Sequence, residues 1–118
     1  MNLEQAHYIL KYYDNLMTFH EKTAWKHWVI NYKIEHSGST QSQKEAKINL
    51  YLKNGRLSSE PTIKELLKNG IDYFIIKTAK RISLDHPKVL KLNNCAKCGK
   101  LARTPFAKQC RYCFHDWH

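Results

Sequence analysis

Apolar residues recur at helical spacing through roughly the first 86 residues. Runs with the i, i+3, i+4, i+7 pattern indicate amphipathic helices. The first run comprises Leu3, Ala6, Ile9, Leu10, Tyr13, Leu16 and Met17. Asn2 with Gln5, and Thr18 with Glu21, have the spacing of capping boxes. A capping box satisfies backbone N–H groups at a helix start, so we expect helices to begin just after residues 2 and 18.

The second helix places Trp25, Trp28 and Tyr32 on one face, which we expect to be core. The segment that follows is ambiguous. Alternating apolar residues at positions 46, 48, 50 and 52 fit a strand, whereas Ser42 with Glu45 fits a helix start. We favour a helix because the neighbouring segments are helical. Asn54-Gly55 ends this segment, and Pro61 begins a short helix.

The clearest helix begins near residue 71. Its apolar face comprises Ile71, Phe74, Ile75, Thr78, Ala79 and Ile82. Lys77, Lys80 and Arg81 fall on the opposite side as a basic stripe. His86-Pro87 should end the helix, because the residue before proline disfavours helical geometry. We therefore predict a mostly α-helical protein, with a domain of about five helices at residues 1–88.

All four cysteines lie in the C-terminal stretch. Cys95 and Cys98 form one pair, eleven residues follow, and Cys110 and Cys113 form the second pair. Two residues between paired cysteines let both sulfurs face one ion, and Zn²⁺ prefers four soft ligands in a tetrahedron. The eleven residues suit a β-hairpin with its turn near Pro105. Four thiolates leave no open position for water, so the predicted Zn²⁺ is structural rather than catalytic.

Residues 93–118 resemble the zinc ribbon family, in which a zinc knuckle surrounds each cysteine pair. The resemblance implies a small β ribbon around one structural Zn²⁺, and a role in nucleic-acid enzymes, transcription, translation or protein docking. Gly99 matches the glycine that follows the first knuckle, whereas Phe114 stands where the second knuckle often has glycine. We also expect Phe114 and Trp117 to cover one side of the site.

Other chemistry at the cysteines stays open. The two pairs could form disulfides or a redox site, although reducing compartments and the doubled spacing favour metal. His115 or His118 could replace one cysteine as a ligand. Iron could occupy the same four-thiolate site.

Charge concentrates in the same half of the chain. The formal net charge is +10. Residues 77–111 carry ten basic side chains against one acidic side chain, Asp85, which gives +9. A region of this kind favours nucleic acid or an acidic protein as partner, although lysine-rich surfaces also keep small proteins soluble. The candidate nucleic-acid contacts are Lys77, Lys80, Arg81, Lys97, Lys100, Arg103, Lys108 and Arg111.

Two functions are consistent with these features. We expect a non-enzymatic zinc-binding protein that binds nucleic acid through the last helix and the ribbon. The alternative is an adaptor that docks on a protein partner through the ribbon. No catalytic constellation stands out, and no small-molecule substrate is evident. The first residues lack the pattern of a signal peptide, and no apolar run approaches the roughly 20 residues that span a bilayer, so we expect a cytoplasmic protein without membrane contact.

Overall fold

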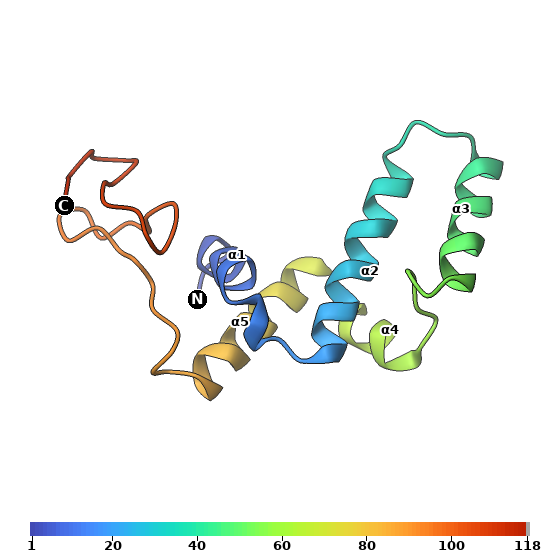
Figure 1. Ribbon diagram of the computed structural model, residues 1–118, viewed down its shortest axis with the longest axis horizontal. Helices are drawn as coiled ribbons and strands as arrows, with labels where there is room; N and C mark the ends of the chain where they lie inside the picture. The colour runs from blue at the N-terminus through green and yellow to red at the C-terminus, as the bar shows by residue number, and fades with distance from the viewer. Residues whose placement is uncertain (118) are drawn as a thin grey trace. The chain divides into compact units, whose positions relative to one another are not determined.

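The computed structural model describes residues 1–117 and is mostly helical, as predicted. The five helices are α1 (Leu3–Tyr12), α2 (Phe19–Glu35), α3 (Gln41–Lys53), α4 (Pro61–Leu67) and α5 (Ile71–Asp85) (Figure 1). A 3₁₀ turn, Asp14–Leu16, follows α1. Within residues 1–117 there is no extended strand, and β pairing is limited to two isolated bridges near the cysteines. None of the described helices has the length and apolar character needed to cross a bilayer.

The helix starts follow from side-chain capping. The Asn2 side chain accepts the N–H of Gln5 at 2.8 Å, and the Gln5 side chain accepts the N–H of Asn2 at 3.1 Å. Thr18 and Glu21 repeat this capping box at the start of α2, as predicted. The segment after residue 40 is a helix, but its cap differs from the prediction. Thr40 caps α3 with Gln43, in place of Ser42 with Glu45, because Thr40 is the last residue with extended backbone.

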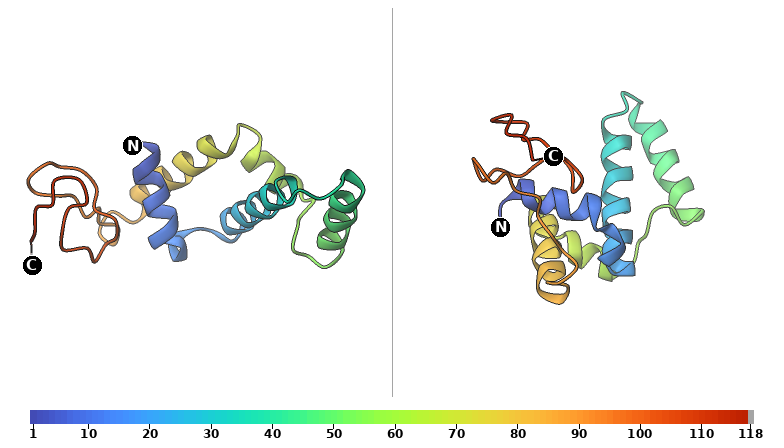
Figure 2. Two further views of the ribbon diagram at one scale, coloured as in Figure 1. Left: turned by 90° about the horizontal axis from the view of Figure 1, so that it is seen from above. Right: turned by 60° about the vertical axis from the view of Figure 1, so that its left-hand side comes forward.

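The chain forms two compact units, which are described separately. Residues 18–74 form one unit, and residues 1–17 with 75–118 form the other. In the first unit α3 and α4 both pack on α2, and the views in Figures 1 and 2 show α2 and α3 side by side. Its buried apolar side chains include Ala24, Ile34, Leu57 and Ile63. The expected boundary between residues 88 and 93 stays a prediction, because compactness does not test whether residues 93–118 fold alone.

The aromatic face of α2 is not the buried core that we expected. Trp25 and Trp28 are half-buried, and Tyr32 is 50% exposed. The rings instead stack along the helix, with centroids 5.9 Å apart for Trp25 and Trp28 and 5.2 Å apart for Trp28 and Tyr32. Tyr32 stacks in turn on His36 at 4.0 Å. Helical spacing places side chains on one face, but it does not determine whether another element covers that face.

Helix α5 matches the predicted pattern and links to the start of the chain. Ile75, Ala79 and Ile82 are buried, whereas Lys77 and Lys80 are exposed. The helix ends at Asp85, directly before His86-Pro87.

Side-chain hydrogen bonds of Arg81 and Tyr13 connect separate segments of the second unit. The guanidinium of Arg81 donates to the backbone oxygen of Leu16 at 3.0 Å and to the Asp85 carboxylate at 2.9 Å. The Tyr13 hydroxyl donates to the backbone oxygen of Lys91 at 3.0 Å. These bonds connect the end of α1 both to α5 and to the segment that leads into the cysteine pairs.

We predict that acid weakens the unit at residues 18–74 through His27. Its Nδ1 accepts the backbone N–H of Ser58 at 3.2 Å, which requires a neutral ring. Burial, with a smaller contribution from Lys64, lowers the pKa of His27. A lowered folded-state pKa means that this contribution is complete above the unfolded value of about 6.5 and is lost as pH falls through the folded value. The contribution is on the order of 1 kcal/mol, the typical net value of one hydrogen bond.

Urea unfolding followed by helical circular dichroism at neutral and mildly acidic pH checks this. The control is His27→Asn, because its side-chain oxygen can accept the same N–H but does not titrate. The variant should lose less stability on acidification than the native chain. An identical loss in both proteins would rule out His27 as the source.

Candidate metal centre

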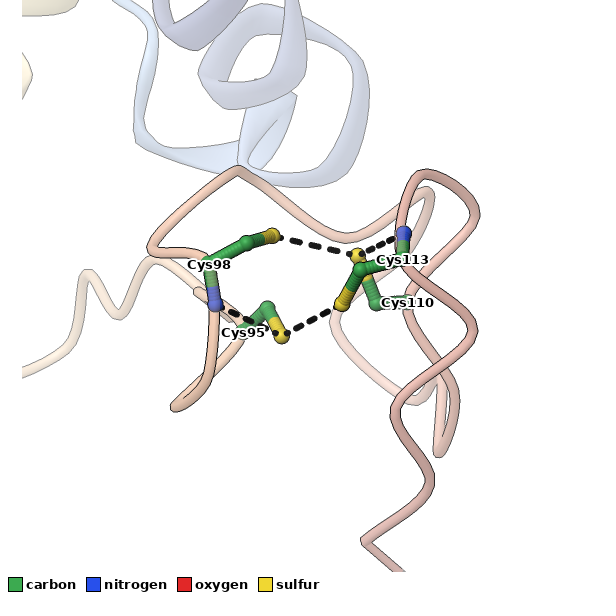
Figure 3. Close-up of side chains that lie close together, drawn as sticks. All are labelled: Cys95, Cys98, Cys110 and Cys113. Atoms are coloured by element: carbon green, nitrogen blue, oxygen red, sulfur yellow. Dashed lines mark hydrogen bonds between the residues drawn. The ribbon is translucent and has the colours of Figure 1, made fainter.

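Four cysteine thiols converge near the C-terminus (Figure 3). Cys95 and Cys98 lie on one loop, and Cys110 and Cys113 lie on another. All four sulfur atoms lie within 4.8 Å of one another. Across the two loops, the sulfurs of Cys95 and Cys113 are 3.7 Å apart, and those of Cys98 and Cys110 are 3.5 Å apart. The four thiols are therefore close enough to bind a single metal ion.

The sulfur spacing fits a metal site better than a pair of disulfides. A Zn–S bond of about 2.3 Å in a regular tetrahedron separates neighbouring sulfurs by about 3.8 Å. The two shortest cross-loop distances, 3.5 and 3.7 Å, are close to that edge length. A disulfide would require about 2.05 Å, and all four cysteines are free thiols. The donor set thus suits a thiophilic ion with four-coordinate geometry.

The same hydrogen bonds close both cysteine loops. In the first loop the N–H of Gly99 donates to the backbone oxygen of Cys95 at 2.9 Å. The N–H of Cys95 in turn donates to the backbone oxygen of Lys100 at 2.9 Å. Equivalent bonds recur fifteen positions later. The N–H of Phe114 donates to the backbone oxygen of Cys110 at 3.0 Å, and the N–H of Cys110 donates to the backbone oxygen of His115 at 2.8 Å. The two isolated bridges have the same offset: Asn94 with Leu101, and Gln109 with Asp116. The two loops are therefore structural repeats, which we call knuckle 1 (residues 94–101) and knuckle 2 (residues 109–116).

The resemblance to zinc ribbons implies a knuckle at each cysteine pair, but the residues around the cysteines give no sign of a repeat. Residues 93–102 read NNCAKCGKLA and residues 108–117 read KQCRYCFHDW, so only the two cysteines coincide. The equal spacing of the two pairs was visible, but it could not show that the surrounding backbone bonds also repeat. The predicted β-hairpin between the pairs is not seen in residues 101–109. The side-chain amide of Asn93 instead organises that segment, donating to the backbone oxygens of Thr104 and Ala107 at 3.0 Å each.

Backbone N–H groups favour the thiolate form of the first cysteine in each knuckle. The N–H of Cys98 donates to the sulfur of Cys95, and the N–H of Cys113 donates to that of Cys110, each at 3.5 Å. These bonds lower the pKa of Cys95 and lower the pKa of Cys110 to about 6. For Cys98 the N–H of Lys100 also lowers the pKa, but burial and neighbouring thiols outweigh it and raise the value to about 11. A metal ion would therefore meet sulfurs that already carry part of the required negative charge.

Residues 99 and 114 occupy the same position in the two knuckles, with unusual backbone geometry. Gly99 has φ +76° and Phe114 has φ +62°, both in the left-handed region. Glycine adopts this region without steric cost, whereas other residues pay roughly 1–2 kcal/mol. Phe114 is the sole non-glycine residue with positive φ among residues 1–117. Replacing the expected glycine by phenylalanine thus leaves the loop geometry intact but strains it.

Few side chains are buried around the thiols. Cys95, Cys110, Leu101 and Ala102 are buried. Contrary to our expectation, Phe114 does not cover the site, because it is 70% exposed. Trp117 is half-buried, with its ring 6.1 Å from the His115 ring. We therefore expect a module with so small a core to need a bound metal for its folding energy.

The group of possible metal ligands within the described residues consists of cysteines alone. His115 is therefore not part of the cluster, although it lies in knuckle 2. His118, the other histidine considered as a ligand, lies outside the described residues. The four-cysteine arrangement accounts for all positions of a tetrahedron.

The predicted basic residues are mostly exposed. Those on the cysteine module are Lys97, Lys100, Arg103, Lys108 and Arg111, all exposed. On α5, Lys77 and Lys80 are exposed, whereas Arg81 is half-buried and bonded to Leu16 and Asp85.

Arg111 and its neighbour also have partners within the chain. Arg111 pairs with the Glu4 carboxylate at 2.7 Å, and the Tyr112 hydroxyl donates to the same carboxylate at 3.2 Å. The Tyr112 ring lies 4.6 Å from the ammonium of Lys100 and 4.9 Å from the guanidinium of Arg111. These contacts connect α1 to knuckle 2 and knuckle 2 to knuckle 1.

Comparison of the chain with protein-family models, with curated proteins and with solved structures finds no match. The assignment of a function therefore rests on the residues and geometry described above.

We predict that metal removal unfolds residues 93–117 and spares the helices α2 to α4. The metal contributes on the order of 10 kcal/mol to the folding of small four-ligand modules, and the few buried side chains here cannot replace it. The measurement is a two-dimensional amide NMR spectrum before and after complete chelation. Signals of Gly99 and Leu101 should collapse to random-coil positions, while those of Ala24 and Ile34 stay. The control is the same chelator saturated with Zn²⁺, and dispersed knuckle signals in verified metal-free protein would contradict the prediction.

Proposed function

We propose that the four cysteines hold one structural Zn²⁺, and that the zinc-bound module and α5 bind nucleic acid without catalysing a reaction. Four thiolates suit Zn²⁺ and leave no open coordination position for water or substrate. The paired knuckles support a relationship to zinc ribbons, although the β-hairpin of that family is not part of the described structure. Free thiols persist under reducing conditions, so we also propose a cytoplasmic location.

The observation that carries the nucleic-acid proposal is the charge pattern around the knuckles. Residues 86–115 contain seven lysines and arginines and no aspartate or glutamate. Five of these cations lie between residues 97 and 111, and all five are exposed. Cations gathered in this way neutralise backbone phosphates and release their counterions. In this proposal Lys and Arg contact phosphates, and Zn²⁺ keeps the knuckles folded.

The cations differ in how readily they could contact phosphate. Within the described residues, Lys80, Lys97, Arg103 and Lys108 form no ion pair. Arg81 is bonded inside the second unit, and we rank it below the others as a phosphate contact. Arg111 would have to leave Glu4, at modest cost because the pair is partly exposed.

An adaptor role is the second candidate, and exposed apolar side chains favour it. Phe106 is 86% exposed and Val89 is 55% exposed. Docking of a protein on such residues would depend little on salt. Binding through phosphates weakens steeply with salt, with a log–log slope of roughly −0.7 to −0.9 per contact.

The first test is a fluorescence-anisotropy titration of the zinc-loaded protein with labelled single- and double-stranded DNA and RNA at low and near-physiological salt. We expect salt-sensitive binding with Kd below about 1 μM at low salt. Neutralising Lys100, Arg103 and Lys108 together should abolish most of it. The matched control neutralises Lys22, Lys26 and Lys53, three exposed lysines of the other unit. Absence of binding at low salt would defeat the proposal and favour the adaptor role.

We further predict that Glu4→Gln strengthens nucleic-acid binding severalfold. The Glu4 carboxylate occupies the Arg111 guanidinium, so its neutralisation frees one cation and removes one repelling charge. The salt slope should steepen by about one contact. The matched control is Glu65→Gln, which removes the same charge from an exposed lysine pair in the other unit. Equal strengthening by both variants would show that only net charge matters and that Arg111 is not a contact.

A further inference from the structure

Phe114 combines strain with exposure, and neither property benefits the fold. Its backbone sits at φ +62°, and its side chain is 70% exposed. Within residues 1–117 its ring stacks on no other aromatic ring and on no cation. Only its backbone is bonded: the N–H donates to the oxygen of Cys110 at 3.0 Å, and the oxygen accepts from the Gln109 side chain at 3.2 Å. Glycine could make both of these bonds.

Knuckle 1 shows what the position requires. Gly99 stands there with φ +76° and makes the equivalent bond to Cys95 at 2.9 Å. A Cβ at Gly99 would meet nothing within 4 Å, so the difference between the two knuckles is not a matter of space. Strained residues that persist without a structural benefit are characteristic of binding sites. The ring at 114 is therefore best explained by a contact outside the chain.

The surrounding charge indicates what that contact is. Lys108 and Arg111 precede the ring in sequence and Asp116 follows it, and residues 86–115 contain no carboxylate. Lys97 and Lys100 lie on the neighbouring knuckle, and Lys100 already reaches over the Tyr112 ring of knuckle 2. Lysines and arginines close in sequence to an exposed aromatic ring are a combination that can bind unpaired nucleotides, with phosphates on the cations and a base on the ring.

Resting on the nucleic-acid function proposed above, we propose that the module binds single-stranded nucleic acid, with an unpaired base stacked on Phe114. A base in a duplex already stacks on its neighbours, so duplex binding would use the cations without the ring. Tyr112 of the same knuckle is less suited to stacking on a base, because two cations and Glu4 already contact it. The geometry does not discriminate the sugar, so the chemistry recognised is that of an unpaired base.

The test compares Phe114 variants on oligothymidylate, oligouridylate and a DNA duplex of matched length, by anisotropy with zinc-loaded full-length protein. Phe114→Gly and Phe114→Asn remove the ring and suit the backbone, whereas Phe114→Tyr keeps the ring. The first two should lose on the order of 10- to 100-fold in single-strand affinity, with little change on duplex. Phe114→Tyr should bind as the native protein does. Oligouridylate against oligothymidylate then shows whether RNA or DNA is preferred.

Competition with a chelator shows whether a Phe114 variant loses affinity for nucleic acid because the ring is missing or because the module no longer folds around Zn²⁺. Phe114→Gly relieves the strain, so it should hold Zn²⁺ against a competing chelator at least as well as the native protein. Better metal retention with weaker single-strand binding is the expected pair of results. Phe19→Ala is the matched control, since Phe19 is 76% exposed but lies in the other unit, and it should leave affinity unchanged.

The outcomes distinguish this inference from the function on which it rests. If the native protein binds no nucleic acid, the proposed function fails. If the native protein binds but the zinc-loaded Gly and Asn variants bind single strands equally well, the stacking proposal is wrong and the phosphate contacts stand. Equal losses on single strands and duplex would also overturn it, because the ring would then not act on an unpaired base.

Discussion

The approach of four sulfurs to one point is the constraint on which the C-terminal module depends. Each pair must turn both of its sulfurs toward the other pair, which forces the chain back on itself after the second cysteine. That reversal places residues 99 and 114 in the left-handed region and aligns the backbone bonds of the two knuckles. Other residues of the module stabilise the segments that adjoin the two knuckles. Asn93 secures the segment between the knuckles with its side-chain amide, and Leu101 and Ala102 are the buried apolar residues at the end of knuckle 1.

A module held by a bound metal, as we propose, rather than by a large core leaves its surface open to other uses. Zinc with four thiolates carries a formal charge of about −2. Part of the surrounding positive charge therefore balances the site itself, and the charge count of residues 77–111 overstates what is available to a partner. The remaining surplus is still large, because seven cations face no carboxylate within residues 86–115. The Glu4 carboxylate of α1 bonds both Arg111 and Tyr112, and Asp116 lies in knuckle 2 directly after this range.

Capping boxes and apolar periodicity, which are local in sequence, predicted the helices well. Features that depend on contacts between distant residues could not be predicted in this way. Asn2 and Thr18 showed where helices begin, and of the six residues predicted for the apolar face of α5 all are buried except Ile71, which is half-buried. The cap of α3 was assigned to Ser42, two positions late, because Thr40 with Gln43 forms an equally good box. The spacing of Trp25, Trp28 and Tyr32 identified a shared face but not its exposure. The cysteine spacing correctly predicted that the four thiols lie together. The β-hairpin inferred from the length of the intervening segment is not seen, since length alone cannot show that the Asn93 side chain holds this segment as a loop.

At Phe114 the backbone conformation and the side chain have to be explained separately. The sequence places a phenylalanine where the second knuckle often has glycine, and we expected this side chain to cover the thiols. The structure shows that the loop has the same geometry with either residue, because closure around the thiols imposes it. Once the metal-binding geometry fixes the backbone, the side chain at this position is released from any structural task. The ring costs folding energy and contacts no other aromatic ring in residues 1–117, which is why we propose that it serves to bind an unpaired base.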